Sequence, residues 1–486
     1  MTKSVEPMKM PSLWLSAGII VMIGTVLTTG ITAGIATIPL LTLNIVLVAV
    51  VSLLSGYPYR ELEQGMMEGV RRSIDCVMIL IFVGVLIAGW ILCGTVPMLI
   101  YYGLSVVSPK LLLPLAFLLC SLLSLCTGSS WGTAGTVGIA CVSIGASIGM
   151  PVAVVAGAAI SGSILGDKLS PLSDATIMAA SASGTGLYQH VRSMAYTTAP
   201  SFLITLLIFY FMGAAYADTP MHPAVVETVR GTLAEIYQFS PLLLLLPMAA
   251  ILVFSLMRMP AIPAILLSGL LGLFLAVAIQ GVDVSTAISA ILQGAASNTG
   301  VEIVDSMLNK GGITAMLSTL CTAVLALGLG GILSRAGYLH VLVEAISRRV
   351  KTDRGTVILT LFCGMITLCL VAQFYVSVAL MGTMFGEIYD ARRIHRSVLS
   401  RTLEESNTIM LPLVPWNTSA VYYMGLFGFH NLAFAPYLVF SYVNIAICLL
   451  CVLSGLFIFR RRADNPAETD WKWHEPVSDS AFAQEA

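Results

Sequence analysis

Residues 166–176 read Gly-Asp-Lys-Leu-Ser-Pro-Leu-Ser-Asp-Ala-Thr, and this charged, proline-containing stretch directly follows the long apolar segment Val137–Ile164. Proline removes a backbone donor and clashes with the preceding helical turn, so we expect a helix to break here. A second segment of this kind runs from residue 404 to residue 419 and contains Leu411-Pro412-Leu413-Val414-Pro415. The sequence therefore predicts two helix breaks, each next to apolar segments.

The composition of the chain indicates its solvent. Of the 486 residues, 57% are hydrophobic and only 10% are charged, whereas a soluble globular domain carries roughly 25% charged residues. No water-soluble fold hides so much apolar surface, so most of the chain must lie in lipid. The net charge of −1 leaves no electrostatic footprint for nucleic acid. We therefore predict a multi-pass protein of the inner (plasma) membrane that is embedded in the lipid bilayer. We do not expect it to bind nucleic acid.

Stretches of about 20 mostly apolar residues, the length that crosses a bilayer, recur along the sequence. They predict an all-α polytopic membrane protein with roughly ten to thirteen crossings. The candidate spans are Ser12–Ala33, Ile38–Gly56, Asp75–Val96, Leu111–Cys126, Val137–Ile164, Thr197–Tyr216, Ser240–Leu256, Ala261–Ile279, Ile313–Leu333, Thr356–Val371, Val376–Ile388 and Tyr437–Phe459.

The two halves of the chain resemble each other. Pro171-Leu172 and Pro412-Leu413 match at an offset of 241, and several other identities share this offset, which predicts a duplicated unit. Lys and Arg gather in cytoplasmic loops, and in matched loops the positive charge alternates between the halves: Tyr57–Ser73 holds three arginines, whereas its partner Val284–Lys310 holds one lysine. We therefore predict two inverted-topology repeats with both termini in the cytoplasm.

This charge pattern divides the chain into five parts. They are a cytoplasmic N-terminus (1–11), transmembrane repeat 1 (12–217), an extracytoplasmic linker (218–239), transmembrane repeat 2 (240–459) and a cytoplasmic tail (460–486). The polar composition of Ala463–Ala486 predicts disorder in that tail. We also expect two copies of the chain to form a homodimer.

Inverted repeats place a binding site near the membrane midplane, where helices break and free their backbone groups. Irregular backbone survives at that depth only where it is buried in protein or lines water. Four polar segments fit this description: 127–136, 166–176, 373–377 and 404–419. We therefore expect broken helices or re-entrant hairpins at the midplane, and with them a carrier of a small solute.

Oxygen-bearing side chains beside the two proline breaks suit a hard cation such as Na⁺. The sequence contains no His/Cys cluster that suggests zinc or iron, so no cofactor is expected apart from Na⁺ as a transported or coupling ion. A carboxylate at membrane depth is costly unless it is paired or coordinates an ion, which makes Asp174 the foremost candidate. The predicted Na⁺ ligands are Asp174, Thr176, Asn417 and Thr418, with Asp174 and Asn417 foremost.

Several of these polar residues also have a purely structural interpretation. Asp167 and Lys168 also fit a local ion pair at a helix end, and Glu404-Glu405 also fit the cytoplasmic interface beside Arg401. The small hydroxyl residues of segment 127–136 also suit close helix packing. At the level of sequence both interpretations stay open.

Three motifs resemble the NhaC-type Na⁺/H⁺ antiporter family, which belongs to the ion transporter superfamily of inverted-repeat, elevator-like carriers. They are GDKLSPLSD at 166–174, RTLEES at 401–406 together with PWNT at 415–418, and GSSWGTAGT at 128–136. The likeness spans about residues 70–460. It implies ion-binding roles for Asp167, Ser173, Asp174, Thr176, Asn417 and Thr418.

The resemblance implies a secondary transporter that exchanges Na⁺ for H⁺. We expect the Asp174 carboxylate to be partly desolvated and therefore to bind the two ions in turn. The alternative is Na⁺- or H⁺-coupled transport of an amino acid or small carboxylate on the same scaffold. Ala175-Thr176-Ile177 stands where the family pattern is similar to Thr-Thr-Asn, and the missing hydroxyl and amide favour this alternative.

In the alternative, the organic cargo binds hydroxyl and amide side chains of the four polar segments, helped by the dipoles of helix N-termini. Its candidate ligands are Ser129, Ser130, Thr133, Gln373, Asn407 and Thr408. No nucleophile–base pair and no phosphate-binding loop are visible in the sequence, so we do not expect an enzyme.

Overall fold

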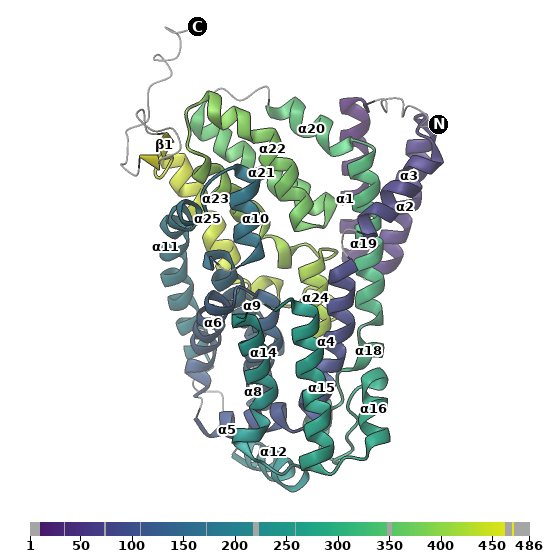
Figure 1. The fold of residues 1–486 in the computed structure, drawn as a ribbon, viewed down its shortest axis with the longest axis vertical. Coiled ribbons are helices and arrows are strands. Elements are labelled where there is room, and N and C mark those ends of the chain that lie inside the picture. Colours follow the sequence, from purple (N-terminus) through teal and green to yellow (C-terminus); the bar gives the residue numbers. More distant parts are fainter. Residues whose placement is uncertain are drawn as a thin grey trace.

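The structure is a computed structural model that describes residues 10–33, 35–71, 74–106, 108–171, 173–216, 223–257, 259–347, 352–461 and 469–470. Within these ranges the chain is built almost entirely of helices (Figure 1), and the predicted all-α polytopic class is confirmed. Most of the predicted N-terminal part and almost all of the tail predicted to be disordered lie outside the described residues.

The first half of the chain ends with the longest helix, α11. Its elements are α1 (Leu13–Thr32), α2 (Thr37–Leu54), α3 (Tyr59–Arg71), α4 (Ile74–Leu92), α5 (Thr95–Val106), α6 (Pro109–Thr127), α7 (Ser130–Thr133), the π-helical turn η1 (Ala134–Gly138), α8 (Ile139–Ser147), α9 (Val152–Leu169), α10 (Asp174–Ser183) and α11 (Leu187–Ala214).

The rest of the chain begins with α12 (Pro223–Ile236) and closes with two short antiparallel strands. Its elements are α13 (Pro241–Leu244), α14 (Leu246–Leu256), α15 (Ala261–Gln280), α16 (Val284–Gln293), α17 (Glu302–Leu308), α18 (Gly312–Ala315), α19 (Leu317–Arg335), α20 (Tyr338–Ser347), α21 (Asp353–Val371), α22 (Phe374–Ala391), α23 (Arg396–Asn407), η2 (Leu411–Leu413), α24 (Thr418–Phe427), η3 (Ala435–Tyr437), α25 (Val439–Ser454), β1 (Arg460–Arg461) and β2 (Thr469–Asp470).

Fewer helices than expected have the length of a full membrane span. Among the described residues seven helices are long and apolar enough to cross, or nine if each of two bent pairs forms one span. The sequence-based estimate treated each apolar stretch as one straight helix. Val137–Ile164, for example, divides into α8 and α9 at Pro151, and α10 and α24 have only 10 residues each. Broken helices therefore account for the difference, because each half covers only part of the bilayer.

The helix boundaries carry a repeated spacing. Helices α6, α9 and α10 begin at residues 109, 152 and 174, and α21, α23 and α24 begin at residues 353, 396 and 418. The same offset, 244, separates the two members of each pair. Helices α6 and α21 both have 19 residues, and α10 and α24 both have 10 residues. This offset is slightly larger than the one from the sequence identities, so Pro171 and Pro412 occupy different points of their breaks.

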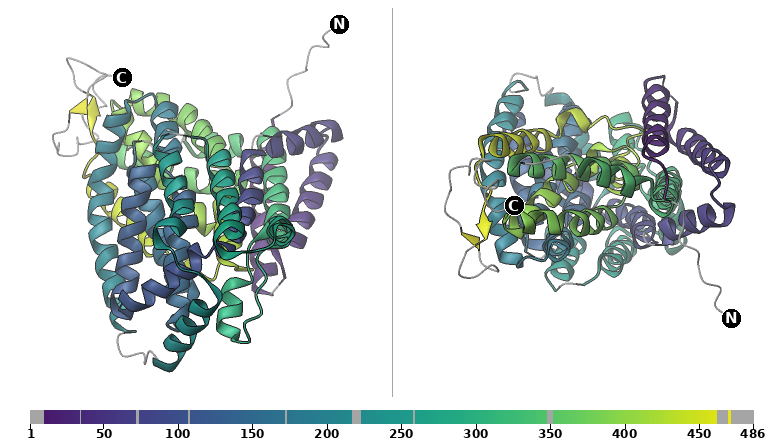
Figure 2. Two further views of the ribbon diagram at one scale, coloured as in Figure 1. Left: turned by 60° about the horizontal axis from the view of Figure 1, so that its bottom comes forward. Right: turned by 90° about the horizontal axis from the view of Figure 1, so that it is seen from above.

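Elements of the two halves lie at opposite ends of the molecule. By the offset of 244, the segment α7–η1–α8 corresponds to α22. Figure 1 places α8 in the half that contains α12, whereas α22 lies in the half that contains β1. Viewed from above in Figure 2, the early helices, drawn in purple, stand on the side opposite the α6, α9 and α11 group, drawn in blue.

Glycines let helix α9 approach α6 closely. A Cβ atom on Gly162 would lie 2.2 Å from the Phe117 carbonyl oxygen, and one on Gly166 would lie 2.3 Å from the Ser121 carbonyl oxygen. Small residues four apart on one helix allow such backbone contact inside membranes. Helix α9 is thereby held against α6, and residue 167 comes to lie beside the break that follows α6.

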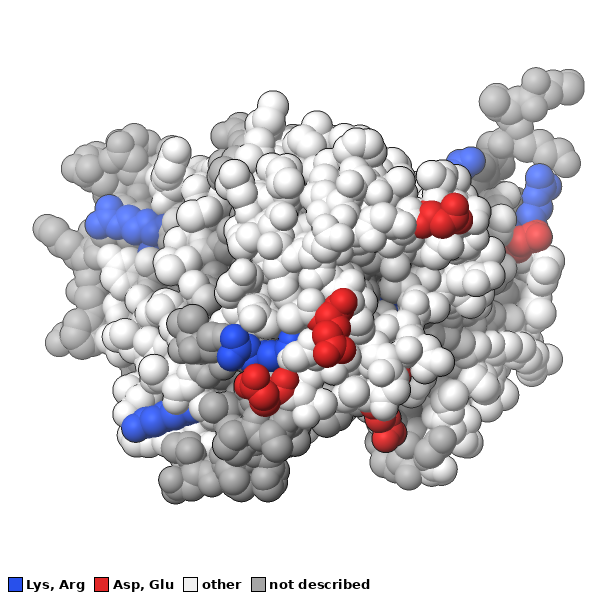
Figure 3. Space-filling model, turned by 90° about the horizontal axis from the view of Figure 1, so that it is seen from below, with Lys and Arg blue, Asp and Glu red and all other residues white. Residues whose placement is uncertain are grey.

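Charged side chains are few on the end of the molecule that carries α12. Figure 3 shows this end, where small acidic and basic groups are scattered over a surface that is mostly neither. The hydrophobic cores lie between the helices.

Candidate functional site

All four polar segments contain a helix break, and each break is followed by a capped helix. The side chain at the N-cap accepts a hydrogen bond from a backbone N–H in each case, which satisfies one of the donors that a helix start leaves free. The caps are Ser129 before α7, Ser173 before α10, Gln373 before α22 and Asn417 before α24. They form two pairs, 129 with 373 and 173 with 417, and both pairs keep the offset of the helix starts.

The carboxylate of Asp167 joins two of these breaks. Ser130 Oγ donates to Asp167 Oδ2 at 2.6 Å, and Ser173 Oγ donates to Asp167 Oδ1 at 2.5 Å. Thr176 Oγ1 approaches the backbone carbonyls of Asp167 and Lys168 at 3.3 and 3.4 Å. Three residues from the predicted lists thus meet at the partly buried Asp167: Ser130 and Ser173 bind its carboxylate, and Thr176 lies near its backbone carbonyl.

Aromatic contacts bring the break at residue 417 to the same place. Trp131 stacks on Tyr422, with ring centroids 4.5 Å apart and planes 6° apart. Trp131 Nε1 donates to Ser419 Oγ at 3.1 Å, and Tyr422 OH donates to the Trp131 carbonyl at 2.7 Å. Helix α7 therefore bridges Asp167 on α9 and the start of α24, where Asn417 Nδ2 is buried without a hydrogen-bond partner in the described part of the chain.

The break at Gln373 follows α21, and side chains near the break at residue 417 contact this helix. Trp416 Nε1 donates to the Cys369 carbonyl at 2.6 Å, next to the end of α21. Further along the same helix, a Cβ atom on Gly364 would lie 2.2 Å from Ser406 Oγ. Gln373 itself uses its side chain to cap α22, accepting from Tyr375 N–H at 3.2 Å.

A buried ion-pair network lies behind Asp167. Lys168 Nζ lies 3.0 Å from Asn444 Oδ1 and 3.8 Å from Glu405 Oε1, and Arg401 Nε lies 4.0 Å from Glu405 Oε2. Thr197 and Cys448 donate to the same carboxylate. Lys168 therefore pairs with Glu405 and not with Asp167, its neighbour in the chain.

The adjacent acids are also buried. Glu404 is 0% exposed and Glu405 1% exposed, so neither side chain is solvated, and Arg401 lies beside Glu405 as the structural interpretation expected. The sequence carried a signal for their importance: two acids stand in a segment that breaks a helix at membrane depth, where charges are rare and usually functional. Their partners on α9, α11 and α25 were not visible in the sequence.

Other predicted residues lie farther from Asp167 or are engaged elsewhere. Asp174 is exposed at the first residue of α10, and no described side chain bonds its carboxylate. Thr408 donates to Glu404, and Asn407 Nδ2 donates to the Leu403 carbonyl and to Ser406 Oγ. Thr133 and Thr418 are buried. The partial desolvation expected for Asp174 is thus found at Asp167 instead.

The donor set fits a hard monovalent cation better than a transition metal. No group of three or more His, Cys, Asp and Glu side chains among the described residues is placed to hold a metal ion. Around Asp167 the available ligands are one carboxylate, two serine hydroxyls and backbone carbonyls. Oxygen ligands of this kind suit Na⁺.

A cavity of about 330 Å³ lies next to the break at Gln373. It is bounded by α3, α19 and the junction of α21 with α22, and glycines 65, 69, 330 and 331 form much of its wall. Arg335 lines it and makes ion pairs with Glu61 at 2.8 Å and with Glu68 at 3.2 Å. The cavity therefore presents both signs of charge beside a helix start.

Many apolar helices, with two helix breaks that meet at a partly buried carboxylate, are typical of a secondary transporter. The comparison with known families agrees and makes the class more specific. The chain belongs to the Na⁺/H⁺ antiporter family, whose sequence pattern matches residues 4–186 and 165–456. The resemblance to NhaC-type antiporters noted from the three motifs is thereby confirmed.

Characterised relatives cover most of the chain. A malate-2H⁺/Na⁺-lactate antiporter of Bacillus subtilis is 35% identical over 83% of this chain and 86% of its own length. The Na⁺/H⁺ antiporter NhaC of Alkalihalophilus pseudofirmus is 31% identical over 83% and 87%. The arginine/ornithine antiporter ArcD of Halobacterium salinarum is 32% identical over 85% of both chains. The chain is therefore a multi-pass antiporter of this family, and its relatives include carriers of ions and of organic solutes.

Proposed function

We propose that the chain exchanges Na⁺ for H⁺ across the membrane, with the Asp167 carboxylate at the centre of its ion site. The observation that supports this most strongly is that serines from two separate breaks, Ser130 and Ser173, donate to this one carboxylate. A serine hydroxyl keeps its lone pairs while it donates, so both oxygens remain available to a cation. The site thus offers Na⁺ an oxygen shell that exists only while the breaks are together.

Exchange follows from the cost of an unpaired charge at this depth. The nearest cation, Lys168, is turned toward Glu405, so Asp167 has hydroxyl groups and no ammonium beside it. An uncompensated negative charge in such a place is costly unless a cation or a proton neutralises it there or on a neighbouring acid. Na⁺ and H⁺ are therefore alternatives, and departure of one favours arrival of the other. In this proposal Asp174, exposed next to Ser173, lies at the approach to the site.

We also propose the inverted arrangement of the halves, with the end that carries β1 in the cytoplasm. The equal helix spacings and the opposite positions of α8 and α22 support it. The positive-inside rule supports the orientation, because Arg460 and Arg461 form β1 and Arg460 donates to the carbonyl of Arg392, which is followed by Arg393. The proposal includes the five parts of the chain predicted from its sequence, and it includes a homodimer.

A second candidate is coupled transport of an amino acid or small carboxylate. The cavity beside Gln373 favours it, since about 330 Å³ accommodates a small organic solute. Arg335 offers donors to a carboxylate, and Glu68 offers an acceptor to an amino group. Relatives named for malate, lactate, arginine and ornithine exchange agree with this candidate.

Proteoliposomes that contain the purified chain and a trapped pH dye test the first proposal. An outward Na⁺ gradient should drive proton movement in the opposite direction, and Asp167→Asn should abolish it while the protein remains folded. Normal exchange by this variant would refute the role of Asp167. In parallel, uptake of labelled amino acids and dicarboxylates, with Gln373→Ala as the variant, decides whether an organic solute is the cargo instead.

A further inference from the structure

Five Lys, Arg, Asp and Glu side chains meet behind the breaks, and their charges do not balance. Lys168 and Arg401 are the two cations, and Asp167, Glu404 and Glu405 are the three acids. Four of the five are fully buried and Asp167 is partly buried. If all are ionised, the group carries one net negative charge in a region of low dielectric constant. One monovalent cation is therefore sufficient to neutralise it.

The two cations serve only one of the acids. Lys168 and Arg401 both lie within 4.0 Å of Glu405, and this carboxylate also receives hydrogen bonds from Thr197 and Cys448. Glu405 is thus fully satisfied as an anion. Asp167 and Glu404 remain as the two acids without a cation in contact. One further positive charge, bound at either acid, neutralises the group.

These two acids have different surroundings. Asp167 receives two hydroxyl hydrogen bonds, one at each oxygen, and is partly accessible. Glu404 receives one, from Thr408 Oγ1 to Oε1 at 2.6 Å. Glu404 Oε2 is buried and has no hydrogen-bond partner among the described residues. An oxygen in that position is costly as part of an anion but is acceptable when it carries a proton.

We propose that Glu404 holds the proton of the exchange and that Asp167 holds Na⁺, so that the two ions compete through charge and not for the same oxygens. This rests on the proposed Na⁺/H⁺ exchange and makes it more specific. When Na⁺ leaves Asp167, a proton from water binds Glu404 Oε2 and restores neutrality. When Na⁺ returns on the other side, the O–H bond breaks and the proton passes back to water. One Na⁺ then moves against one H⁺, with no net charge transferred.

The groups that surround Glu404 are consistent with this assignment. The charged neighbours that act on it most are Asp167 and Lys168 on α9 and Glu405 on its own helix. The helices packed against α23 contribute further titratable groups: Asp174 on α10, His190 on α11, Cys363 on α21, Tyr389 on α22 and Cys448 on α25. None of these makes a hydrogen bond to Glu404 Oε2 in the described structure.

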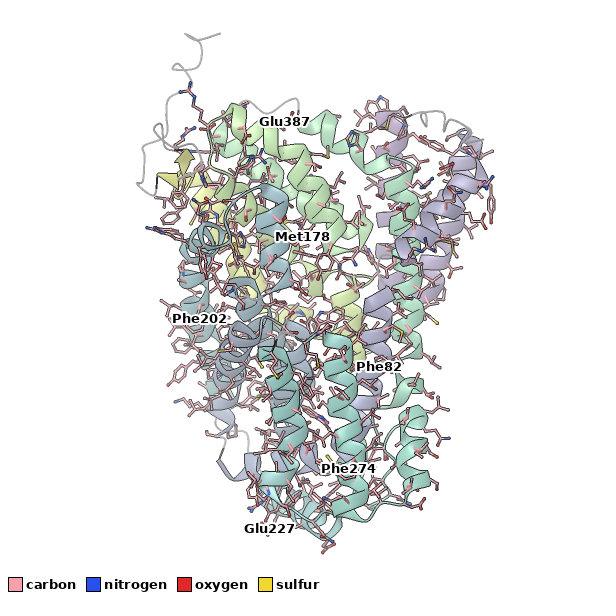
Figure 4. All side chains as sticks on the ribbon, in the orientation of Figure 1. Phe82, Met178, Phe202, Glu227, Phe274 and Glu387 are labelled. Carbon is pink, nitrogen blue, oxygen red and sulfur yellow. The ribbon has the colours of Figure 1, made fainter. Side chains whose placement is uncertain are left out.

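The test is the pH dependence of Na⁺ binding to the full chain in lipid nanodiscs, measured with radioactive Na⁺. In the unaltered protein the apparent Kd for Na⁺ should rise by about tenfold for each unit that the pH falls below the pKa of Glu404, because one proton then opposes one Na⁺. In Glu404→Gln the side chain is always neutral, so the affinity for Na⁺ should be weak and independent of pH over the same range. Glu387→Gln, which alters an exposed glutamate at the end of α22 (Figure 4), should behave as the unaltered protein.

A milder variant guards against loss of folding in Glu404→Gln. Thr408→Val keeps the side-chain shape and removes the hydroxyl that donates to the Glu404 carboxylate. It should move the onset of proton competition to higher pH by about one unit, since a hydrogen bond to a charged group is lost. If either variant keeps the unaltered pH profile, the proton is not on Glu404. Loss of Na⁺ binding in Asp167→Asn, with normal folding, separately supports the Na⁺ site, so the two proposals fail independently.

Discussion

Lys168 follows Asp167 directly in the chain, yet its ammonium Nζ lies 3.8 Å from Glu405 Oε1 on a different helix. Successive side chains on a helix point about 100° apart, so Asp167 faces the breaks and Lys168 faces α23 and α25. The lysine is 0% exposed. This arrangement explains why one acid is committed to a structural ion pair and another remains available to an ion.

The ion pair should contribute to stability only as a pair. Lys168→Met removes one partner and leaves a buried carboxylate with Arg401 alone, which in soluble proteins costs ~3–5 kcal/mol. We expect a clear fall in melting temperature in detergent for this variant. Glu405→Met should lower the melting temperature further, because it leaves two buried cations, Lys168 and Arg401, without the acid that they share. Equal melting temperatures for the two variants would contradict this assignment.

The serines at Asp167 should set the affinity for Na⁺. Ser130→Ala removes one hydroxyl from the proposed shell, and we expect about a tenfold weaker apparent affinity for Na⁺, as for loss of one polar contact to a charged group. Ser173→Ala should act similarly, although it also removes the cap of α10. Flux measurements across a Na⁺ titration in proteoliposomes provide the readout. Ser181→Ala, on the exposed side of α10, is the control, and an equal effect there would exclude a local role for Ser130.

Helix α9 packs so closely against α6 that a side chain at position 166 should disrupt the interface. A Cβ atom there would lie 2.3 Å from the Ser121 carbonyl and 2.5 Å from the Leu125 amide nitrogen, and backbone atoms cannot give way cheaply. Gly166→Ala should therefore lower the yield of folded protein and the melting temperature. Gly24→Ala on α1, where nothing lies within 4 Å of the new Cβ, should fold normally. Equal yields of the two variants would show that the α6–α9 interface is looser than described.

Much of the site could be predicted because its residues are local in sequence. The GDKLSPLSD stretch predicted a break, and the structure places one between the end of α9 at Leu169 and the start of α10 at Asp174. Polar residues at the other three segments likewise indicated helix ends, and each segment supplies a side chain that caps a helix. Local rules were sufficient here, because proline, glycine and capping side chains act on their own backbone.

Which of the two acids in that stretch lies at the site could not be predicted from local sequence. From the sequence, Asp174 and Asp167 were both candidates, with Asp174 preferred. Ser130 approaches Asp167 from a different break, on the far side of α8 in the chain, and Asp174 is exposed. Similarly, the repeat was visible as an offset of 241, but the helix starts give 244, and at this offset Pro171 corresponds to Pro415 and not to Pro412.

The sequence alone determined the membrane environment, the helical class, the family and the positions of the four breaks, since composition, apolar runs and capping residues act over a few turns of chain. Only the tertiary structure decided which acid meets the serines, which acid meets the lysine, and which carboxylate oxygen has no partner. Those outcomes depend on contacts of α9 with the start of α7 in its own half and with α23 in the other half, and the energy of a buried charge is set by its neighbours in space.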